Sequence, residues 1–309
     1  MGDSGQRPLV IAHRGASGYL PEHSLVAKAL AYGQGADYLE QDVVASRDGV
    51  AIVFHDLTLD AVTDVAGKFP GRARADGLHY VIDFEFSELQ RLAIGPRLDS
   101  SGTPVYPDRF SRQGGSFPIS SLDAELHFIR ALNKSAGREV GIYPEIKDPL
   151  WHREHGIELG TLLLDVLDQH GYLQSDQRVF LQCFDAEELQ RVAAQLGSKA
   201  PPMIQLLGRA NAGLLKRLPD IAVYAQGIGP SLRMLLAGLD RASGRVPTDL
   251  VSRAHAAGLQ VHPYTLRADD LPSGLADFEA LLDILVRQLQ VDGLFTDFPD
   301  RVRRYLGGA

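Results

Sequence analysis

The fold is decided by the segment that opens with VIAHRGASGYLPEHS (10–24), continues through GADYLEQDVV (35–44) and closes with VAIVFHD (50–56). Each piece contains a short apolar run, which is typical of a strand buried on both faces of a parallel sheet. The strands are predicted at 9–13, 38–44 and 50–55. The polar groups HRG, EQD and FHD are then expected at the C-terminal ends of these strands.

The same alternation of strand and helix continues after residue 120. Helical patterns that end in glycine, such as SLDAELHFIRALNKSAG (121–137) and AEELQRVAAQLG (186–197), separate further apolar runs. These runs are predicted as strands at 140–147, 178–184, 202–207, 222–229, 259–266 and 291–299. About eight strand–helix units result, which indicates a parallel sheet covered by helices.

Polar clusters follow nearly every predicted strand, and this distribution favours a TIM (β/α)₈ barrel, which builds its site at that end of the strands. A doubly wound open sheet is the alternative, but it would gather ligand groups at one switch point. We predict a single barrel domain over 1–309. Residues 56–120 break the pattern and are too long for an ordinary βα loop, so they are predicted as a small lobe inserted after the third strand. A spacer or a dimerisation arm is the alternative for this stretch.

Composition excludes several classes of protein. The formal net charge of the 309 residues is -8 and no basic stripe alternates with aromatic residues, so nucleic acid is not expected as a partner. No apolar run reaches the roughly 18 residues of a membrane helix. The single cysteine, Cys183, excludes a disulfide within the chain and a thiolate zinc cluster. A homodimer is possible. We expect a periplasmic protein if a leader was removed from this chain, and a cytoplasmic one otherwise.

Three acidic residues point to a metal site. Glu40 and Asp42 are two positions apart on a predicted strand, so both side chains leave the same face. Two carboxylates on one buried face repel each other unless a cation or a proton lies between them. Glu145 ends another strand, and three converging carboxylates suit a hard cation such as Ca²⁺ or Mg²⁺. Pairing of Glu40 with an arginine or lysine at the barrel rim remains the alternative.

Two histidines and two cations complete the candidate site. His13 and His55 end different strands, and imidazoles on either side of a metal can divide acid and base work. Asp56 can orient one ring. Arg14 and Lys147 can hold an anionic oxygen. This combination with a divalent cation indicates a phosphate-containing substrate, because a metal next to a phosphoryl group neutralises developing charge.

From about Leu9 to Tyr305 the chain resembles the glycerophosphodiester phosphodiesterases, through HRGASGYLPEHS, GADYLEQDVVASRDGVAIVFHD, PEIK, LQCFD and GLFTDFPD. LPEHS and VHPYTLRADDLP resemble the periplasmic, glycerol-phosphate-utilisation branch. One departure is His23-Ser24, where many members carry Asn-Thr. The resemblance implies a TIM barrel with an inserted lobe. It also implies one divalent metal ion, usually Ca²⁺ in that branch and Mg²⁺ in others.

The resemblance assigns a role to each candidate residue. The metal ligands are Glu40, Asp42 and Glu145, and the acid/base pair is His13 and His55. Arg14 and Lys147 contact the phosphate, and Glu22 and Gln182 join the substrate-binding residues. Glu22 can act either behind the site or on the glycerol.

The function that follows is hydrolysis of glycerophosphodiesters to sn-glycerol 3-phosphate and an alcohol, through a cyclic phosphate. Two alternatives are kept. A phospholipase D-like enzyme acting on lysophospholipids would need an apolar rim, which phenylalanines of the insertion can supply: Phe69, Phe84, Phe86, Phe110 and Phe117. A non-catalytic binding protein on the same barrel would not need both histidines, all three carboxylates and both cations.

Overall fold

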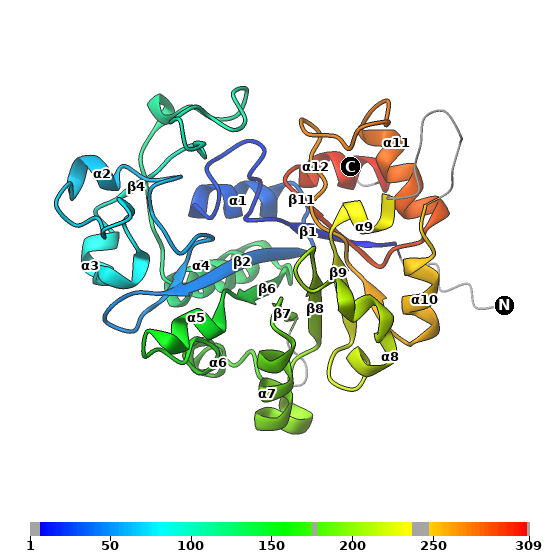
Figure 1. Ribbon diagram of the computed structural model, residues 1–309. Helices are drawn as coiled ribbons and strands as arrows, with labels where there is room; N and C mark the ends of the chain where they lie inside the picture. Colours follow the sequence, from blue (N-terminus) through cyan, green and yellow to red (C-terminus); the bar gives the residue numbers. More distant parts are fainter. Residues whose placement is uncertain (1–6, 175–177, 237–246, 308–309) are drawn as a thin grey trace.

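The computed structural model describes residues 7–174, 178–236 and 247–307. Within these residues, eight parallel strands form one sheet in the order β10-β9-β8-β7-β6-β2-β1-β11 (Figure 1). They are β1 (Leu9–Ala12), β2 (Tyr38–Ala45), β6 (Gly141–Ile146), β7 (Leu181–Cys183), β8 (Met203–Leu207), β9 (Gly227–Pro230), β10 (Gln260–Val261) and β11 (Gly293–Thr296). Beyond β10, the Leu266 amide donates to the Phe295 carbonyl at 2.8 Å, which brings the two ends of the sheet together. The predicted (β/α)₈ barrel is confirmed.

Helices surround the strands and bury an apolar layer against them. Ser24, Ser121 and Asp185 each accept a backbone N–H bond at a helix start, which satisfies donors that the helix itself leaves free. The helices are α1 (Leu25–Gly33), α4 (Leu122–Ala136), α5 (Pro149–Glu154), α6 (Leu159–Gln169), α7 (Ala186–Leu196), α8 (Leu218–Ile221), α9 (Leu232–Leu236), α10 (Leu250–Ala256), α11 (Phe278–Leu282) and α12 (Pro299–Tyr305).

The third predicted strand is not a barrel strand, and the sequence prediction is wrong on this point. β3 (Ala51–Val53) pairs antiparallel with β2, with Val43 opposite Val53. The physical reason is the short connection: antiparallel strands can be joined by a tight turn, whereas a parallel pair needs a crossover of a dozen or more residues. Gly49 supplies that turn with a φ of 75°. Because β3 runs back along β2, the chain returns toward Asp42, whose carbonyl accepts the Phe54 amide at 2.9 Å.

Residues 56–120 follow this hairpin as the lobe at the left of Figure 1. Short elements make up the lobe: α2 (Val65–Lys68), α3 (Phe86–Leu89), and a two-stranded sheet of β4 (Ala93–Ile94) and β5 (Phe117–Pro118). Their apolar side chains form a separate core with those of the hairpin, in which Phe84 shares one buried cluster with Val44 and Ile52. The lobe therefore leaves the barrel after β3, within the second strand–helix unit.

Two predictions concern the location of the protein: its compartment and the lack of a membrane span. Residues 1–6, on which a leader would be judged, lie outside the described residues, so the compartment stays a prediction. Within the described part of the chain, no helix has both the length and the apolar character needed to cross a membrane.

A buried ion pair holds α1, α4 and β2 together. The Nζ atom of Lys28 lies 2.7 Å from Glu125 Oε1 and also donates to the Glu40 carbonyl. Gln41 donates to the same Glu125 oxygen at 2.9 Å. Lys28 and Glu125 are both completely buried. The ion pair thus anchors β2 to the two helices at Glu40 and Gln41.

Replacing one member of this pair is expected to destabilise the fold. Lys28→Met should lower the free energy of unfolding by about 3–5 kcal/mol, because Glu125 is left buried without its cation. Urea denaturation followed by circular dichroism measures the change. The double variant Lys28→Met/Glu125→Leu is the control and should recover most of the loss. A single variant as stable as the parent would show that the pair contributes nothing.

Candidate functional site

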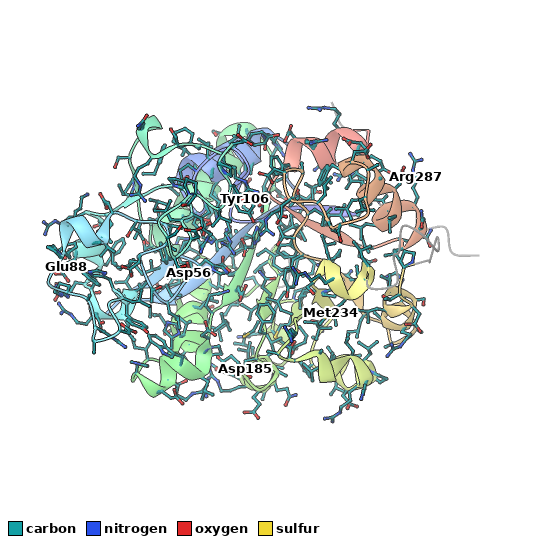
Figure 2. The ribbon with its side chains drawn as sticks, turned by 45° about the horizontal axis from the view of Figure 1, so that its top comes forward. Asp56, Glu88, Tyr106, Asp185, Met234 and Arg287 are labelled. Atoms are coloured by element: carbon teal, nitrogen blue, oxygen red, sulfur yellow. The ribbon has the colours of Figure 1, made fainter. Side chains whose placement is uncertain are left out.

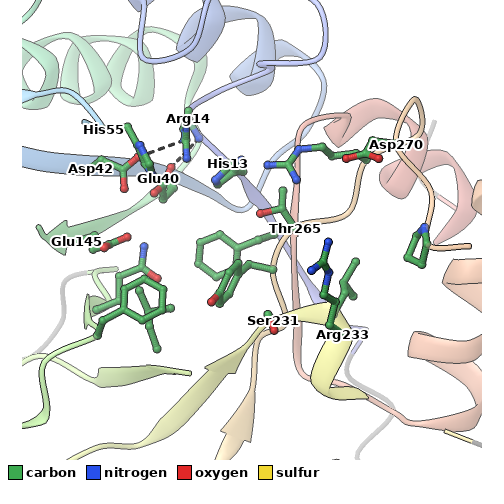
Figure 3. Close-up of a pocket in the computed structure, with 18 of the residues that line it drawn as sticks. His13, Arg14, Glu40, Asp42, His55, Glu145, Ser231, Arg233, Thr265 and Asp270 are labelled. Atoms are coloured by element: carbon green, nitrogen blue, oxygen red, sulfur yellow. Dashed lines mark hydrogen bonds and ion pairs between the residues drawn. The ribbon is translucent and has the colours of Figure 1, made fainter. Parts of the chain in front are cut away.

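A cavity of about 790 Å³ opens at the C-terminal ends of the strands. Eight of the nine predicted site residues line it: His13, Arg14, Glu40, Asp42, His55, Glu145, Lys147 and Gln182. Figure 3 shows Glu40, Asp42 and Glu145 on one side of the cavity, together with His55 and Arg14, and Ser231 and Arg233 on the other. Chain segments that are more than a hundred residues apart therefore supply one site.

Strand register explains why the carboxylates meet. In the parallel pairing of β2 with β6, Asp42 lies opposite Glu145, and Gln182 follows on β7. Lys147 Nζ lies 3.0 Å from Glu145 Oε1 and 3.6 Å from Asp42 Oδ1. The three predicted metal ligands and Lys147 thus form one charged cluster at the end of two adjacent strands.

The charges in this cluster are unevenly balanced. Burial, together with the neighbouring Asp42, raises the pKa of Glu40 well above its usual value. Burial also raises the pKa of Glu145 to about 8, against the opposing effect of Lys147. Burial acts in the same direction on Asp42, but Lys147, His55 and Arg14 outweigh it and hold the Asp42 pKa well below its usual range. The cluster has more carboxylate than its own cations neutralise, which is a fit for an added divalent cation.

His23, which the sequence analysis noted only as a departure from the family pattern, is a neighbour of the carboxylate cluster. Its Nε2 lies 2.8 Å from Asp42 Oδ2, and its ring is buried. Ligand-type atoms of His23, Glu40 and Asp42 all lie within 4.8 Å of one another. The residue has a φ of 60°, a left-handed conformation in which Asn and His are enriched among non-glycine residues. This backbone conformation is compatible with His at position 23 as well as with the Asn that many members of the resembled family carry.

The HRG loop shapes the first strand end. Arg14 has a φ of 58°, and its amide donates to Glu40 Oε2 at 2.6 Å. The Arg14 guanidinium donates to Glu22 at 2.8 Å, and its Nε lies 3.2 Å from Asp42 Oδ2. Gly15 has a φ of 88°, and a Cβ there would lie 2.7 Å from the Ala27 backbone. Only glycine fits here, because any side chain at this position would collide with the start of α1.

His13 is held by a carboxylate from the last strand. Its Nδ1 lies 2.6 Å from Asp297 Oδ1. Burial alone would raise the pKa of Asp297, but Arg267, His13 and Arg109 lower it far more, so the carboxyl is ionised. Nδ1 is therefore the protonated nitrogen, and Nε2 is the free acceptor. Burial and Arg14 lower the pKa of His13 to about 4, which keeps the ring neutral near pH 7.

His55 has the same kind of partner. Its Nδ1 is hydrogen-bonded to the neighbouring Asp56, as expected from the sequence. Although burial raises the Asp56 pKa, His55 and Arg97 together lower it. Burial and Arg14 lower the pKa of His55. Both histidines therefore present Nε2 as the free nitrogen.

Two arginines of the lobe support both histidines. Arg97 donates to Asp56 Oδ2 at 2.7 Å and grips Glu22 through Nε and Nη2. Arg109 Nη2 lies 2.9 Å from Asp297 Oδ2, and its guanidinium also binds Asp269. The sequence analysis missed Arg97, Arg109 and Asp297. The FTDFP motif marked Asp297 as a strand-end polar residue, but no local pattern indicated contacts across the lobe.

Glu22 is the predicted site residue that the cavity leaves out. Its carboxylate binds Arg14 and Arg97, so it supports the site instead of lining it. Gln182 lines the cavity, and its Oε1 is buried without a hydrogen-bond partner among the residues that the structure describes. His262, which follows another barrel strand, lies in the barrel interior, and its Nδ1 is hydrogen-bonded to the Tyr143 hydroxyl at 2.8 Å. In the lobe, Phe84 is fully buried and Phe69 and Phe86 pack against its cluster, so these three belong to the core and not to an acyl-binding rim.

A model of the glycerophosphoryl diester phosphodiesterase family matches residues 13–301. The chain belongs to this family. It is 38% identical to a glycerophosphodiester phosphodiesterase of Haemophilus influenzae, over 97% of this chain and 90% of the relative. Identity to the enzyme of the same name in Treponema pallidum is 37%, over 97% and 92%. The predicted family and enzyme class are confirmed, and the periplasmic branch stays a prediction.

Solved structures agree on the fold. A putative glycerophosphoryl diester phosphodiesterase from Silicibacter pomeroyi superposes with a TM-score of 0.73 at 23% identity, covering 98% of this chain and 95% of that one. An Oleispira antarctica phosphodiesterase, solved with its product sn-glycerol-3-phosphate, has a TM-score of 0.65 at 22% identity, covering 98% of each chain. At these identities the likeness concerns the barrel itself.

The lobe's contribution to the site can be measured through Arg97. Arg97→Gln should lower kcat about 10–100-fold, because Asp56 loses its cation and no longer holds the His55 ring in place. The matched control is Arg72→Gln, another lobe arginine, which binds Glu88. Figure 2 shows Glu88 at the outer edge of the lobe, away from Asp56. Equal losses in both variants would mean that only the stability of the lobe matters.

Proposed function

We propose that the protein hydrolyses glycerophosphodiesters to sn-glycerol 3-phosphate and the free alcohol. The observation that carries the proposal is the pair of histidines at one cavity, each with Nδ1 bound to an ionised carboxylate. Each imidazole can take a proton at Nε2 and, once protonated there, give one back, so the pair can exchange protons with a substrate between them. Arg14 and Lys147, which line the same cavity, supply positive charge for a phosphodiester. The activities of the relatives point the same way.

A divalent cation fits the carboxylate cluster. Glu40, Asp42 and Glu145 would hold it, and an all-oxygen set favours Ca²⁺ or Mg²⁺ over softer ions. We propose Ca²⁺ as the native ion, following the branch that the sequence resembles. Bound there, the cation would neutralise charge that develops on the phosphoryl oxygens. Two of these carboxylates are held in place by neighbours: His23 bonds Asp42, and Lys147 pairs with Glu145.

The reaction is proposed to proceed in two displacements. In the first, His13 takes the proton of the glycerol hydroxyl next to the phosphoester carbon, and the hydroxyl oxygen attacks phosphorus. The bond from phosphorus to the alcohol breaks, and His55 gives its proton to the departing oxygen. A cyclic phosphate remains. The neutral state of His13 suits the base, and His55, which is more exposed, suits the acid near the outgoing alcohol.

Water opens the ring in the second displacement, with the roles reversed. His55 takes a proton from water as the water oxygen bonds to phosphorus. The bond from phosphorus to the ring oxygen that had attacked breaks, and His13 returns its proton to that oxygen. Arg14 faces the phosphate, and an anionic substrate beside His55 favours the protonated form that the first step requires.

An assay of sn-glycerol 3-phosphate release tests the function directly. The parent protein should release it from glycerophosphocholine and glycerophosphoethanolamine, since the proposed chemistry does not involve the head group. His13→Ala and His55→Ala should each lose about 10²–10⁴-fold in rate. His262→Gln, at a buried histidine outside the cavity wall, is the control for the loss of an imidazole. Parent-like turnover by either alanine variant would remove that histidine from the mechanism.

Removal of metal should abolish turnover. Excess chelator is expected to stop the reaction because the buried carboxylates then repel an anionic substrate, and added Ca²⁺ or Mg²⁺ should restore it. Circular dichroism recorded on the same samples separates loss of metal from loss of fold. Undiminished activity in excess chelator would contradict the metal proposal.

The cyclic intermediate requires a neighbouring hydroxyl on the substrate. A phosphodiester whose glycerol lacks that hydroxyl should be turned over far more slowly, while binding as a competitive inhibitor through its phosphate. Comparison of kcat and KM for the two substrates measures the effect. Equal kcat values would indicate direct attack by water instead.

A further inference from the structure

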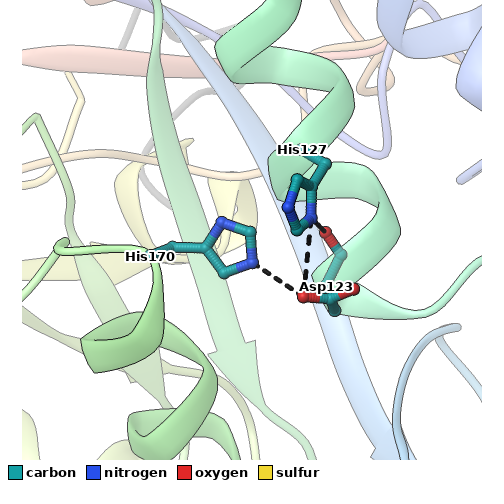
Figure 4. A group of neighbouring side chains, drawn as sticks. All are labelled: Asp123, His127 and His170. Atoms are coloured by element: carbon teal, nitrogen blue, oxygen red, sulfur yellow. Dashed lines mark hydrogen bonds and ion pairs between the residues drawn. The ribbon is translucent and has the colours of Figure 1, made fainter.

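A second cluster of metal-ligating side chains lies outside the cavity wall. Asp123 and His127 are four positions apart on α4, and His170 follows the last residue of α6. Figure 4 shows the three side chains pointing toward one another from two separate segments. His170 Nε2 lies 2.8 Å from Asp123 Oδ1, and His127 Nδ1 lies 3.5 Å from the same oxygen. The His170 ring is hydrogen-bonded to this carboxylate oxygen, while His127 Nδ1 lies beside it and is bonded to the Asp123 backbone carbonyl at 3.0 Å.

The three groups are held in position before any ligand arrives. Asp123 and His127 stand one turn apart on a 15-residue helix whose start is capped by Ser121, so they face the same side. The His170 side chain is 5% exposed, and its carbonyl accepts a 2.6 Å hydrogen bond from Arg130, which is on α4. The two imidazole rings meet edge to face with centroids 4.5 Å apart. On binding, His127 Nδ1 and His170 Nε2 would exchange their hydrogen bonds to Asp123 for bonds to the ion, while the helices stay in place.

We propose that Asp123, His127 and His170 form a second metal site, selective for a divalent transition metal such as Zn²⁺. All three ligand atoms lie within 4.8 Å of one another, a spacing that small shifts can close around an ion with bonds of about 2.0–2.2 Å. Two imidazole nitrogens and one carboxylate oxygen suit Zn²⁺, Cu²⁺ or Ni²⁺, whereas the oxygen cluster of the cavity suits Ca²⁺ or Mg²⁺. The side chains of His127 and Asp123 are 72% and 56% exposed, so the ion can enter and water can complete its coordination.

Such a site has a structural consequence. The ion would join α4 to the segment that follows α6, two parts of the outer helical layer. A ligand that binds only the folded state stabilises it, so zinc should raise the thermal midpoint of unfolding. None of the three residues lines the catalytic cavity, so turnover and zinc binding at this site should be separable.

Equilibrium dialysis of the full-length protein against Zn²⁺ tests the proposal. Because the cavity carboxylates can also take up zinc, the comparison is between variants: His127→Ala should bind one zinc ion fewer per chain than the parent at micromolar concentrations. The matched control is His255→Ala, which removes an exposed histidine 2.9 Å from Asp292 but outside any three-residue cluster in the described part of the chain. It should bind as many ions as the parent.

Electron paramagnetic resonance of bound Cu²⁺ gives a second readout that identifies the ligands. The parent should show coupling to two imidazole nitrogens at this site, and His127→Ala or Asp123→Asn should lose that signal while circular dichroism remains unchanged. The thermal shift with zinc should shrink in the same variants. Equal zinc stoichiometry and an equal thermal shift in the parent and in His127→Ala would overturn the proposal, whatever the outcome of the phosphodiesterase assays.

Discussion

The candidate site depends on how the buried carboxylate of Asp42 is balanced. His23, Arg14 and Lys147 all approach its two oxygens, and together with His55 they keep it ionised despite its burial. An unpaired charge at this depth would be prohibitively costly, so these partners have to be in place. Their positions in turn require the left-handed HRG loop and the pairing of β2 with β6. Loop conformation, strand register and site electrostatics are therefore parts of one constraint.

The lobe extends the same principle to the histidines. Arg97 and Arg109 leave the lobe and bind the carboxylates that hold His55 and His13. A carboxylate that fixes a ring has to stay ionised itself, and an arginine from another segment ensures this. The lobe is consequently part of the framework of the candidate site, and an interpretation as a mere spacer does not account for these contacts.

The sequence predicted the barrel because short apolar runs and glycine-ended helices alternate with a regular period. It also predicted the groups at the strand ends, since the order of residues within HRG, EQD and PEIK is local information. Its errors have two different causes. β3 was taken for a barrel strand because its apolar run has no feature that distinguishes antiparallel from parallel pairing; only the short connection through Gly49 does. Asp297 and Arg109 meet across nearly two hundred residues, and no local spacing encodes such a contact.

What the sequence determined by itself was the identity and order of the candidate site groups: two histidines, three carboxylates and two cations, each on a strand or just after one. It also indicated the family to which the chain belongs. Only the tertiary structure decided how those groups are held. It turned Glu22 away from the cavity to bind two arginines, brought His23 onto Asp42, and placed lobe arginines behind both histidines. The physical reason is that a side chain's type follows from the sequence, whereas its burial, charge balance and hydrogen-bond partners depend on segments that only folding brings together.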